Sequence, residues 1–439
     1  MSIPFRLTPL AALIAVLAWA PLPLASNRPG SSALLSLLLF AVAALAAWQR
    51  DSVRWTPARA TALALFGGAL GWSLVQAAPG FGVALPHWEG IRALTGHPAW
   101  GSLSITPGAT AEAALRLAGY GAAAWLGAAV LAGQHARHRV VQALALITGA
   151  LAVYALIVQS TGSYTIWWWD KWIYQDVTTA TFVNRNAYCV YAGVGVAAAM
   201  LAAETATRTH AKWMWRVLAG VGLLAAVLTE SRWGLASVGA GLAVLVLLRP
   251  GPLPWRALGA GAVAVVLAPV ALVLAGQGRF FARLDPQFVL GDLRWDIYRV
   301  TLEAISAAPW TGHGLGSYPV VYKHVRDTSL TDTLVFQAHS VPLELMAELG
   351  IPAALALMGA FVLLVAEAAR HARRDGDPLA RLAAAAGLMA GLHGLLDFSM
   401  QTPALAVTVL VLLGAGGTPT APAPARSPAR AAPGPPLGP

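Results

Sequence analysis

Residues 31–48 read SSALLSLLLFAVAALAAW, an uncharged apolar stretch with nearly the length that a helix needs to cross a lipid bilayer. Similar blocks recur along the 439-residue chain, which is 57% hydrophobic and 11% charged, with a mean hydropathy of +0.63. A soluble domain carries roughly a quarter charged residues. Long apolar blocks separated by short polar segments are typical of membrane-spanning helices. The sequence therefore predicts an all-α, polytopic membrane protein.

The apolar blocks divide the chain into about 12 expected transmembrane helices. Nine are expected within residues 1–275 and three more within 339–416. Residues 276–338 between them form the longest polar segment, and its amphipathic part at 292–308 predicts helices lying on the membrane surface. The tail at 417–439 is rich in Pro, Ala and Gly, which predicts disorder. The expected spans are 8–25, 31–48, 60–78, 111–131, 140–160, 187–203, 217–230, 233–248, 257–275, 341–367, 379–396 and 402–416.

The basic residues predict the orientation of these helices. With the N-terminus inside, 17 of the 29 Lys and Arg residues fall in inner segments, and six fall in short outer loops. Cytoplasmic loops carry this kind of excess. We therefore expect both termini in the cytoplasm and the 276–338 segment on the outer face. The net charge of +10 then reflects membrane topology and membrane lipids, not a nucleic-acid partner.

Arginines gather on the expected outer face. Guanidinium groups bind phosphate well because their planar fork donates two parallel hydrogen bonds. Such a cluster would suit a lipid-linked diphosphate at the outer surface. The alternative is contact with lipid head groups, which accounts for most arginines at helix ends. The cluster consists of Arg185 between Asn184 and Asn186, then Arg232, Arg279, Arg283, Arg294 and Arg299.

A histidine and three carboxylates lie near the same face. His339 precedes a helix that Pro342 is suited to begin, close to the positive end of the helix dipole, so a neutral imidazole is available there as a base. Glu344 and Glu348 share one face of that helix, where they could orient His339 or pair with loop arginines. Asp397 at the outer end of the eleventh span could pair with an arginine. For each residue a purely structural role remains open.

Several common catalytic motifs do not occur in the sequence. No Walker loop, dinucleotide-binding glycine motif or zinc-spaced His/Cys cluster is found. We therefore expect no metal and no cofactor. A transporter or lipid flippase is a rival class that the number of spans would suit. Few charges lie within the spans and the polar groups collect at one face, which favours an enzyme.

An ordered set of short elements resembles the superfamily of O-antigen ligases and O-antigen polymerases, and is most like the ligases. The set extends over nearly the whole chain. At two positions after His339 the chain has Ser340 and Pro342, where the family often has Asn and an aromatic residue. The elements are Asn27-Arg28-Pro29, Ser104-Ile105-Thr106-Pro107, Thr181-Phe182-Val183-Asn184-Arg185-Asn186, Thr229-Glu230-Ser231-Arg232, Gly312-His313-Gly314-Leu315-Gly316 and the segment from Ala338-His339 to Glu348-Leu349-Gly350.

The resemblance implies a lipopolysaccharide O-antigen ligase in the bacterial inner membrane. It would transfer a glycan from undecaprenyl diphosphate to lipid A–core at the periplasmic face, with inversion and without a metal. In this interpretation His339 is the general base, and Arg185, Arg232 and Arg294 hold the diphosphate, with Arg299 and Arg279 as further candidates. A polymerase of O-antigen or another surface polysaccharide is the alternative. A protein-glycosylating relative is a further option, though no large soluble C-terminal domain supports it.

Overall fold

The computed structural model describes residues 8–80, 88–89, 93–94, 96, 101–252, 294–327 and 335–417, which are mostly helical. The principal helices are α1 (Pro9–Trp19), α2 (Pro29–Trp48), α3 (Pro57–Ala77), α5 (Pro107–Val130), α6 (Gln134–Thr161), α7 (Arg185–Thr205), α8 (Thr209–Val227), α9 (Arg232–Leu247), α13 (Arg294–Ala307), α14 (Tyr318–Val325), α15 (Val341–Leu349), α16 (Ile351–Asp375), α17 (Pro378–Leu396) and α18 (Pro403–Gly416). Short 3₁₀ turns lie at Leu24–Ser26 (η1) and Ser399–Gln401 (η3), and strands β1 (Thr165–Ile166) and β2 (Trp169–Asp170) form a small hairpin.

The fold is that of an all-α membrane protein. Seven helices in the described part are long and apolar enough to cross a bilayer, namely α2, α3, α5, α6, α7, α16 and α17. The apolar helices α1, α9 and α18 are shorter, with 10–17 residues. Helices occupy eleven of the twelve expected span positions, and seven of these positions hold a helix long and apolar enough to cross a bilayer. The expected span at 257–275 and the tail from 418 lie outside the described residues.

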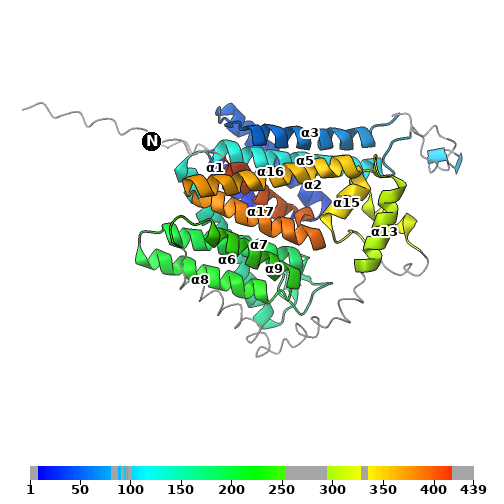
Figure 1. Ribbon diagram of the computed structural model, residues 1–439. Helices are drawn as coiled ribbons and strands as arrows, with labels where there is room; N and C mark the ends of the chain where they lie inside the picture. The colour runs from blue at the N-terminus through cyan, green and yellow to red at the C-terminus, as the bar shows by residue number, and fades with distance from the viewer. Residues whose placement is uncertain are drawn as a thin grey trace, which may run out of the picture.

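Helix α7 forms the centre of the bundle. It packs against α6, α8, α9 and α17 (Figure 1). Of its most apolar 18-residue stretch, 94% is buried. Glycines allow two of these close approaches. A Cβ at Gly195 would meet Thr148 Oγ1 at 2.0 Å, and a Cβ at Gly193 would meet Val238 Cγ2 at 2.3 Å. The N-terminus of α7, with Asn184, Arg185 and Asn186, is therefore fixed by packing along the whole helix.

Helices α13 and α15 lie together at one end of the bundle (Figure 1). The amphipathic stretch expected at 292–308 is seen as α13. The span expected at 341–367 is divided into α15 and α16, because the backbone turns at Gly350 with φ 79°. Gly312 packs against this joint, and a Cβ there would lie 2.2 Å from the Glu348 carbonyl oxygen. The glycine-rich stretch 312–316 is thus a structural turn that fixes α15 against the bundle.

Buried ion pairs close other helix ends of the bundle. Arg59 binds Glu367 at 3.3 Å, Arg137 binds Asp377, and Arg381 binds Glu204 at 3.1 Å. The same guanidinium groups donate to backbone carbonyls at the C-terminal ends of α18 and α9. Three basic residues that the sequence marks as inner-face charges therefore also join helices. Buried arginine is stable there because each charge has both a carboxylate and carbonyl partners.

Candidate active site

The N-terminus of α7 directs its side chains to two different sides. Asn184 is the N-cap, and its side chain accepts hydrogen bonds from the backbone N–H groups of Asn186 (2.7 Å) and Ala187 (3.0 Å). This cap satisfies two otherwise unpaired donors. The Asn186 side chain extends to Asp397, whereas Arg185 extends to Glu230 and Tyr174. Asn184 thus fixes the start of α7, from which Asn186 points towards Asp397 and Arg185 points towards Glu230.

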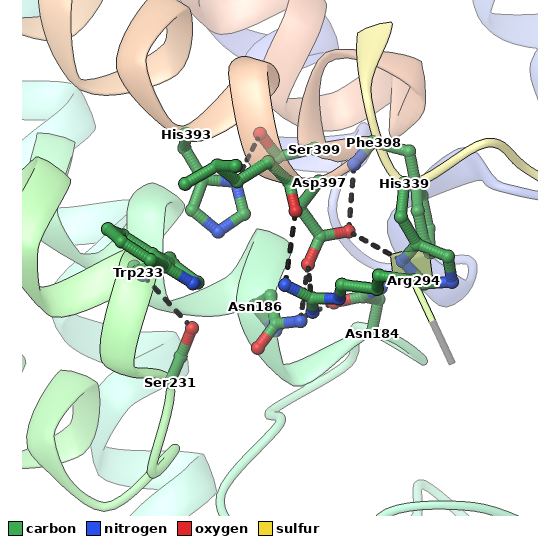
Figure 2. A network of polar contacts seen from close by, with 12 residues as sticks. Asn184, Asn186, Ser231, Trp233, Arg294, His339, His393, Asp397, Phe398 and Ser399 are labelled. Atoms are coloured by element: carbon green, nitrogen blue, oxygen red, sulfur yellow. Dashed lines mark hydrogen bonds and ion pairs between the residues drawn. The ribbon is translucent and has the colours of Figure 1, made fainter. Parts of the chain in front are cut away.

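Asp397 is the centre of a buried polar cluster (Figure 2). It directly follows α17, and its side chain is 2% exposed. Its carboxylate accepts hydrogen bonds from the Asn186 amide and from the Phe398 backbone N–H. Arg294 Nη2 and His339 Nδ1 each lie 3.6 Å from its oxygens. We call Asn186, Arg294, His339 and Asp397 the Asp397 cluster.

Basic neighbours keep Asp397 ionised. Burial alone would raise the pKa of Asp397, since it disfavours the charged form. The contact with His339 and the nearby His393 and Arg294 outweigh that effect and hold the pKa below its usual range. The side chain is therefore a carboxylate at neutral pH, able to stabilise a positive charge on His339.

His339 is held by both its backbone and its ring. Its backbone has φ 52°, a left-handed conformation that is strained for a residue with a side chain. The Tyr298 hydroxyl donates to its carbonyl oxygen at 3.0 Å, and its ring packs edge-on to Phe398 with centroids 5.1 Å apart. With Nδ1 towards Asp397 at ion-pair distance, Nε2 is the ring nitrogen on the other edge. A histidine backed by a carboxylate in this way can accept a proton from a substrate.

Glu344 connects the two segments that carry His339 and Asp397. One carboxylate oxygen accepts the backbone N–H of Ala338 at 2.6 Å, and the other accepts the Gln401 amide at 2.6 Å. Glu348 accepts the backbone N–H of Tyr318 at 3.0 Å. Burial raises the pKa of both glutamates, and repulsion from Glu348 raises that of Glu344 further. These contacts place Glu344 next to the His339 backbone.

The candidate arginines divide into separate groups. Arg294 lies in the Asp397 cluster and also donates to the Leu396 carbonyl at 3.2 Å. Arg232 is the first residue of α9 and is half-buried beside the turn that carries Glu230. Arg299 is 47% exposed and binds Glu303 and Asp327 at 3.0 and 2.8 Å, away from the cluster. Arg279 lies outside the described residues.

Tyr298 and Phe398 contribute to this region without having been singled out from the sequence, and Glu230 was noted only as part of the element Thr229–Arg232. Tyr298 lies one helical turn after Arg294, and Phe398 directly follows Asp397. Closeness in sequence to Arg294 and Asp397 was the only sign that Tyr298 and Phe398 belong to the site. Glu230 has a φ of 53° in the turn between α8 and α9, and its contact with Arg185 spans a long stretch of chain. Within the described residues, no group of three His, Cys, Asp or Glu side chains is arranged to hold a metal.

Comparison with known protein families finds one match. Residues 217–358 match the sequence profile of a family described as O-antigen ligase. This segment belongs to the O-antigen ligase superfamily. No curated protein matches the chain. The match supports a multi-pass membrane protein with a ligase-type or polymerase-type glycosyltransferase function in a broad sense. It includes Arg294 and His339, whereas Asn186 and Asp397 come from outside the matched segment.

Proposed function

We propose that this protein is an O-antigen ligase that transfers a glycan from undecaprenyl diphosphate to lipid A–core. The observation that carries the proposal is the contact of His339 and Arg294 with one buried carboxylate, Asp397, each at 3.6 Å. This arrangement combines a base with a cation for a departing diphosphate. Arg185 and Arg232, at the starts of α7 and α9, are the other proposed diphosphate ligands, and the Arg185 guanidinium is directed towards Glu230 and Tyr174.

The proposed reaction is a single displacement with inversion. The acceptor hydroxyl oxygen attacks the anomeric carbon, and His339 Nε2 takes the hydroxyl proton. The bond from that carbon to the phosphate oxygen breaks, and its electron pair leaves with the diphosphate. Asp397 stabilises the imidazolium that forms, and Arg294 neutralises the leaving group. The two charges that develop in the transition state each have an opposite charge in place.

The distribution of buried charge favours an enzyme over a transporter. Among the described residues, buried charged side chains lie near helix ends, in connecting segments or in the short helix α15. A transporter usually places its polar site near the middle of the membrane, on broken helices. We place the Asp397 cluster at the periplasmic face of the inner membrane, and the Arg59 and Arg137 ion pairs with both termini at the cytoplasmic face. This orientation follows the basic residues of the sequence.

The proposal is tested by replacing His339 with Ala and measuring glycan transfer from purified lipid-linked donor to lipid A–core. We expect the rate to fall about 10²- to 10⁴-fold, the usual contribution of a positioned general base. His324→Ala is the matched control, because His324 is an exposed residue of α14. Unchanged transfer by His339→Ala would exclude the base role.

Deletion of the gene separates the ligase from the polymerase. Loss of a ligase leaves lipopolysaccharide without attached O-chain. Loss of a polymerase leaves a single attached repeat, and that result would replace the proposed acceptor with a second lipid-linked glycan. The state of the lipopolysaccharide, resolved by size, distinguishes these outcomes directly.

A further inference from the structure

His339 has a backbone conformation that a histidine does not favour by itself. Its φ of 52° lies in the left-handed region, and a residue with a side chain stays there only where the surrounding structure fixes it. The next residue, Ser340, is the N-cap of α15, but its side chain makes no capping hydrogen bond to the described first turn of that helix. The usual contact at a helix start therefore does not hold this turn, and other side chains must do so.

Two side chains hold the backbone on either side of His339. Glu344, in the first turn of α15, accepts the Ala338 N–H at 2.6 Å, one residue before His339. The Tyr298 hydroxyl donates to the His339 carbonyl oxygen at 3.0 Å, on the far side of the Cα atom. Rotation about the His339 φ bond would move one of these partner atoms relative to the other. The two hydrogen bonds together therefore fix the direction in which the imidazole leaves the backbone.

The helix that carries Tyr298 also carries Arg294. The two residues are four apart on α13, so they lie on the same face of that helix. Arg294 Nη2 lies 3.6 Å from an Asp397 oxygen (Figure 2), and Nη1 donates to the Leu396 carbonyl at 3.2 Å. One face of α13 thus holds both the proposed cation for the leaving group and the backbone of the proposed base. Helix geometry sets the spacing between them.

Glu344 makes a corresponding connection to the segment that carries Asp397. Its other carboxylate oxygen accepts the Gln401 amide at 2.6 Å, and Gln401 ends the η3 turn that follows Asp397. Glu344 is buried, so little water competes for either hydrogen bond. The segments before His339 and after Asp397 are therefore joined through one side chain, which helps to hold Nδ1 at 3.6 Å from the Asp397 carboxylate.

We propose that Tyr298 and Glu344 are positioning residues for glycan transfer, which hold His339 with Nδ1 towards Asp397 and Nε2 towards the acceptor hydroxyl. This inference rests on the proposed function, in which His339 is the base. Both side chains act through the His339 backbone and not through the substrate. A displacement of about 1 Å at a reacting group can lower a rate about 100-fold. Loss of either hydrogen bond should therefore slow the chemical step more than it weakens donor binding.

The first test is Tyr298→Phe, which removes one hydroxyl and keeps the ring. Transfer is measured with the full-length protein in lipid vesicles, from undecaprenyl-diphosphate-linked glycan to lipid A–core. We expect kcat to fall about 10- to 100-fold and KM for the donor to stay within about twofold of wild type. Tyr322→Phe is the matched control, because the buried Tyr322 hydroxyl has no hydrogen-bond partner among the described residues. It should leave both parameters unchanged.

Glu344 is tested by comparing two replacements. Glu344→Leu removes the acceptor for the Ala338 N–H and should lower kcat as Tyr298→Phe does. Glu344→Gln keeps an oxygen for that N–H and should retain most of kcat. The thermal unfolding midpoint of each variant identifies any that fail to fold, and Tyr298→Phe tests the proposal without Glu344→Leu. Tyr298→Phe added to His339→Ala should lower the remaining rate no further, because its effect requires the imidazole.

Several results would overturn the positioning roles. A wild-type kcat for folded Tyr298→Phe would do so, and so would a loss confined to KM, which would make the hydroxyl a substrate ligand. Glu344→Gln as slow as Glu344→Leu, or a further loss of rate in the double variant, would also count against them. In each of these cases transfer still depends on His339, and the proposed function stands. If His339→Ala transfers glycan at the wild-type rate, the proposed function fails and the positioning roles fail with it.

Discussion

Replacing Asp397 with Asn removes the negative charge that faces His339 and keeps a side chain of similar size. In the proposed reaction His339 becomes positive as it takes the acceptor proton. Two unit charges at the observed 3.6 Å interact by roughly 4–5 kcal/mol at an effective dielectric constant of about 20. The His339 side chain is 28% exposed, so water screens part of this energy. We expect a loss of about 2–4 kcal/mol in the transition state, or roughly 30- to 1,000-fold in rate.

The assay for Asp397→Asn is the initial rate of transfer at saturating lipid-linked donor, with purified protein in lipid vesicles. Asp375→Asn, whose carboxylate is 54% exposed at the far end of α16, should behave as wild type. The thermal unfolding midpoint of each variant separates misfolding from a slow chemical step. A folded Asp397→Asn protein with a rate within about threefold of wild type would refute the role of this charge in stabilising the imidazolium.

Two further predictions concern stability. Arg137→Gln leaves the buried Asp377 without its arginine partner, so we expect the free energy of unfolding to fall by about 3–5 kcal/mol. Arg139 is exposed, so Arg139→Gln should leave the thermal unfolding midpoint nearly unchanged. Equal effects of the two variants would contradict the structural role of the ion pair. In the folded protein the pKa of Glu344 is raised above its ordinary value of 4.5. The protonated side chain therefore contributes its full stabilisation below pH 4.5, and this stabilisation is lost as pH rises through the folded-state pKa. Glu344→Gln should therefore reduce the fall in unfolding midpoint between about pH 5 and pH 8, and an unaltered pH dependence would show that this carboxyl does not titrate as described.

The helices of this protein could be predicted from sequence because hydropathy reports directly on the lipid environment. Proline at helix starts and the Asn184 cap also mark several boundaries correctly, including those of α7 and α15. The break at Gly350 was not predicted, although Gly350 and Pro352 mark it, since Gly350 adopts φ 79° and Pro352 lies in the first turn of α16. The packing of Gly312 against the joint, which sequence alone does not reveal, fixes the turn in place.

The site could be predicted only in part. His339, Arg294 and Asp397 were each singled out as candidates, but the sequence does not indicate that one carboxylate contacts the other two. The sequence favoured Arg185, Arg232 and Arg294 over Arg299 and Arg279 but did not show what each would contact. In the structure Arg299 is satisfied by Glu303 and Asp327, and Arg185 faces Glu230. Which carboxylate meets which guanidinium depends on how distant helices pack, and residue type and spacing do not encode that.

The Asp397 cluster draws half of its members from outside the segment that matches the O-antigen ligase family. His339 and Arg294 lie within residues 217–358, and Asn186 and Asp397 do not. A chimera that exchanged this segment with that of a relative would therefore cut the cluster in two. It would work only where the incoming histidine and arginine met a compatible asparagine and aspartate in the recipient. Exchanges among such proteins should succeed more often when the start of α7 and the end of α17 are transplanted along with the segment.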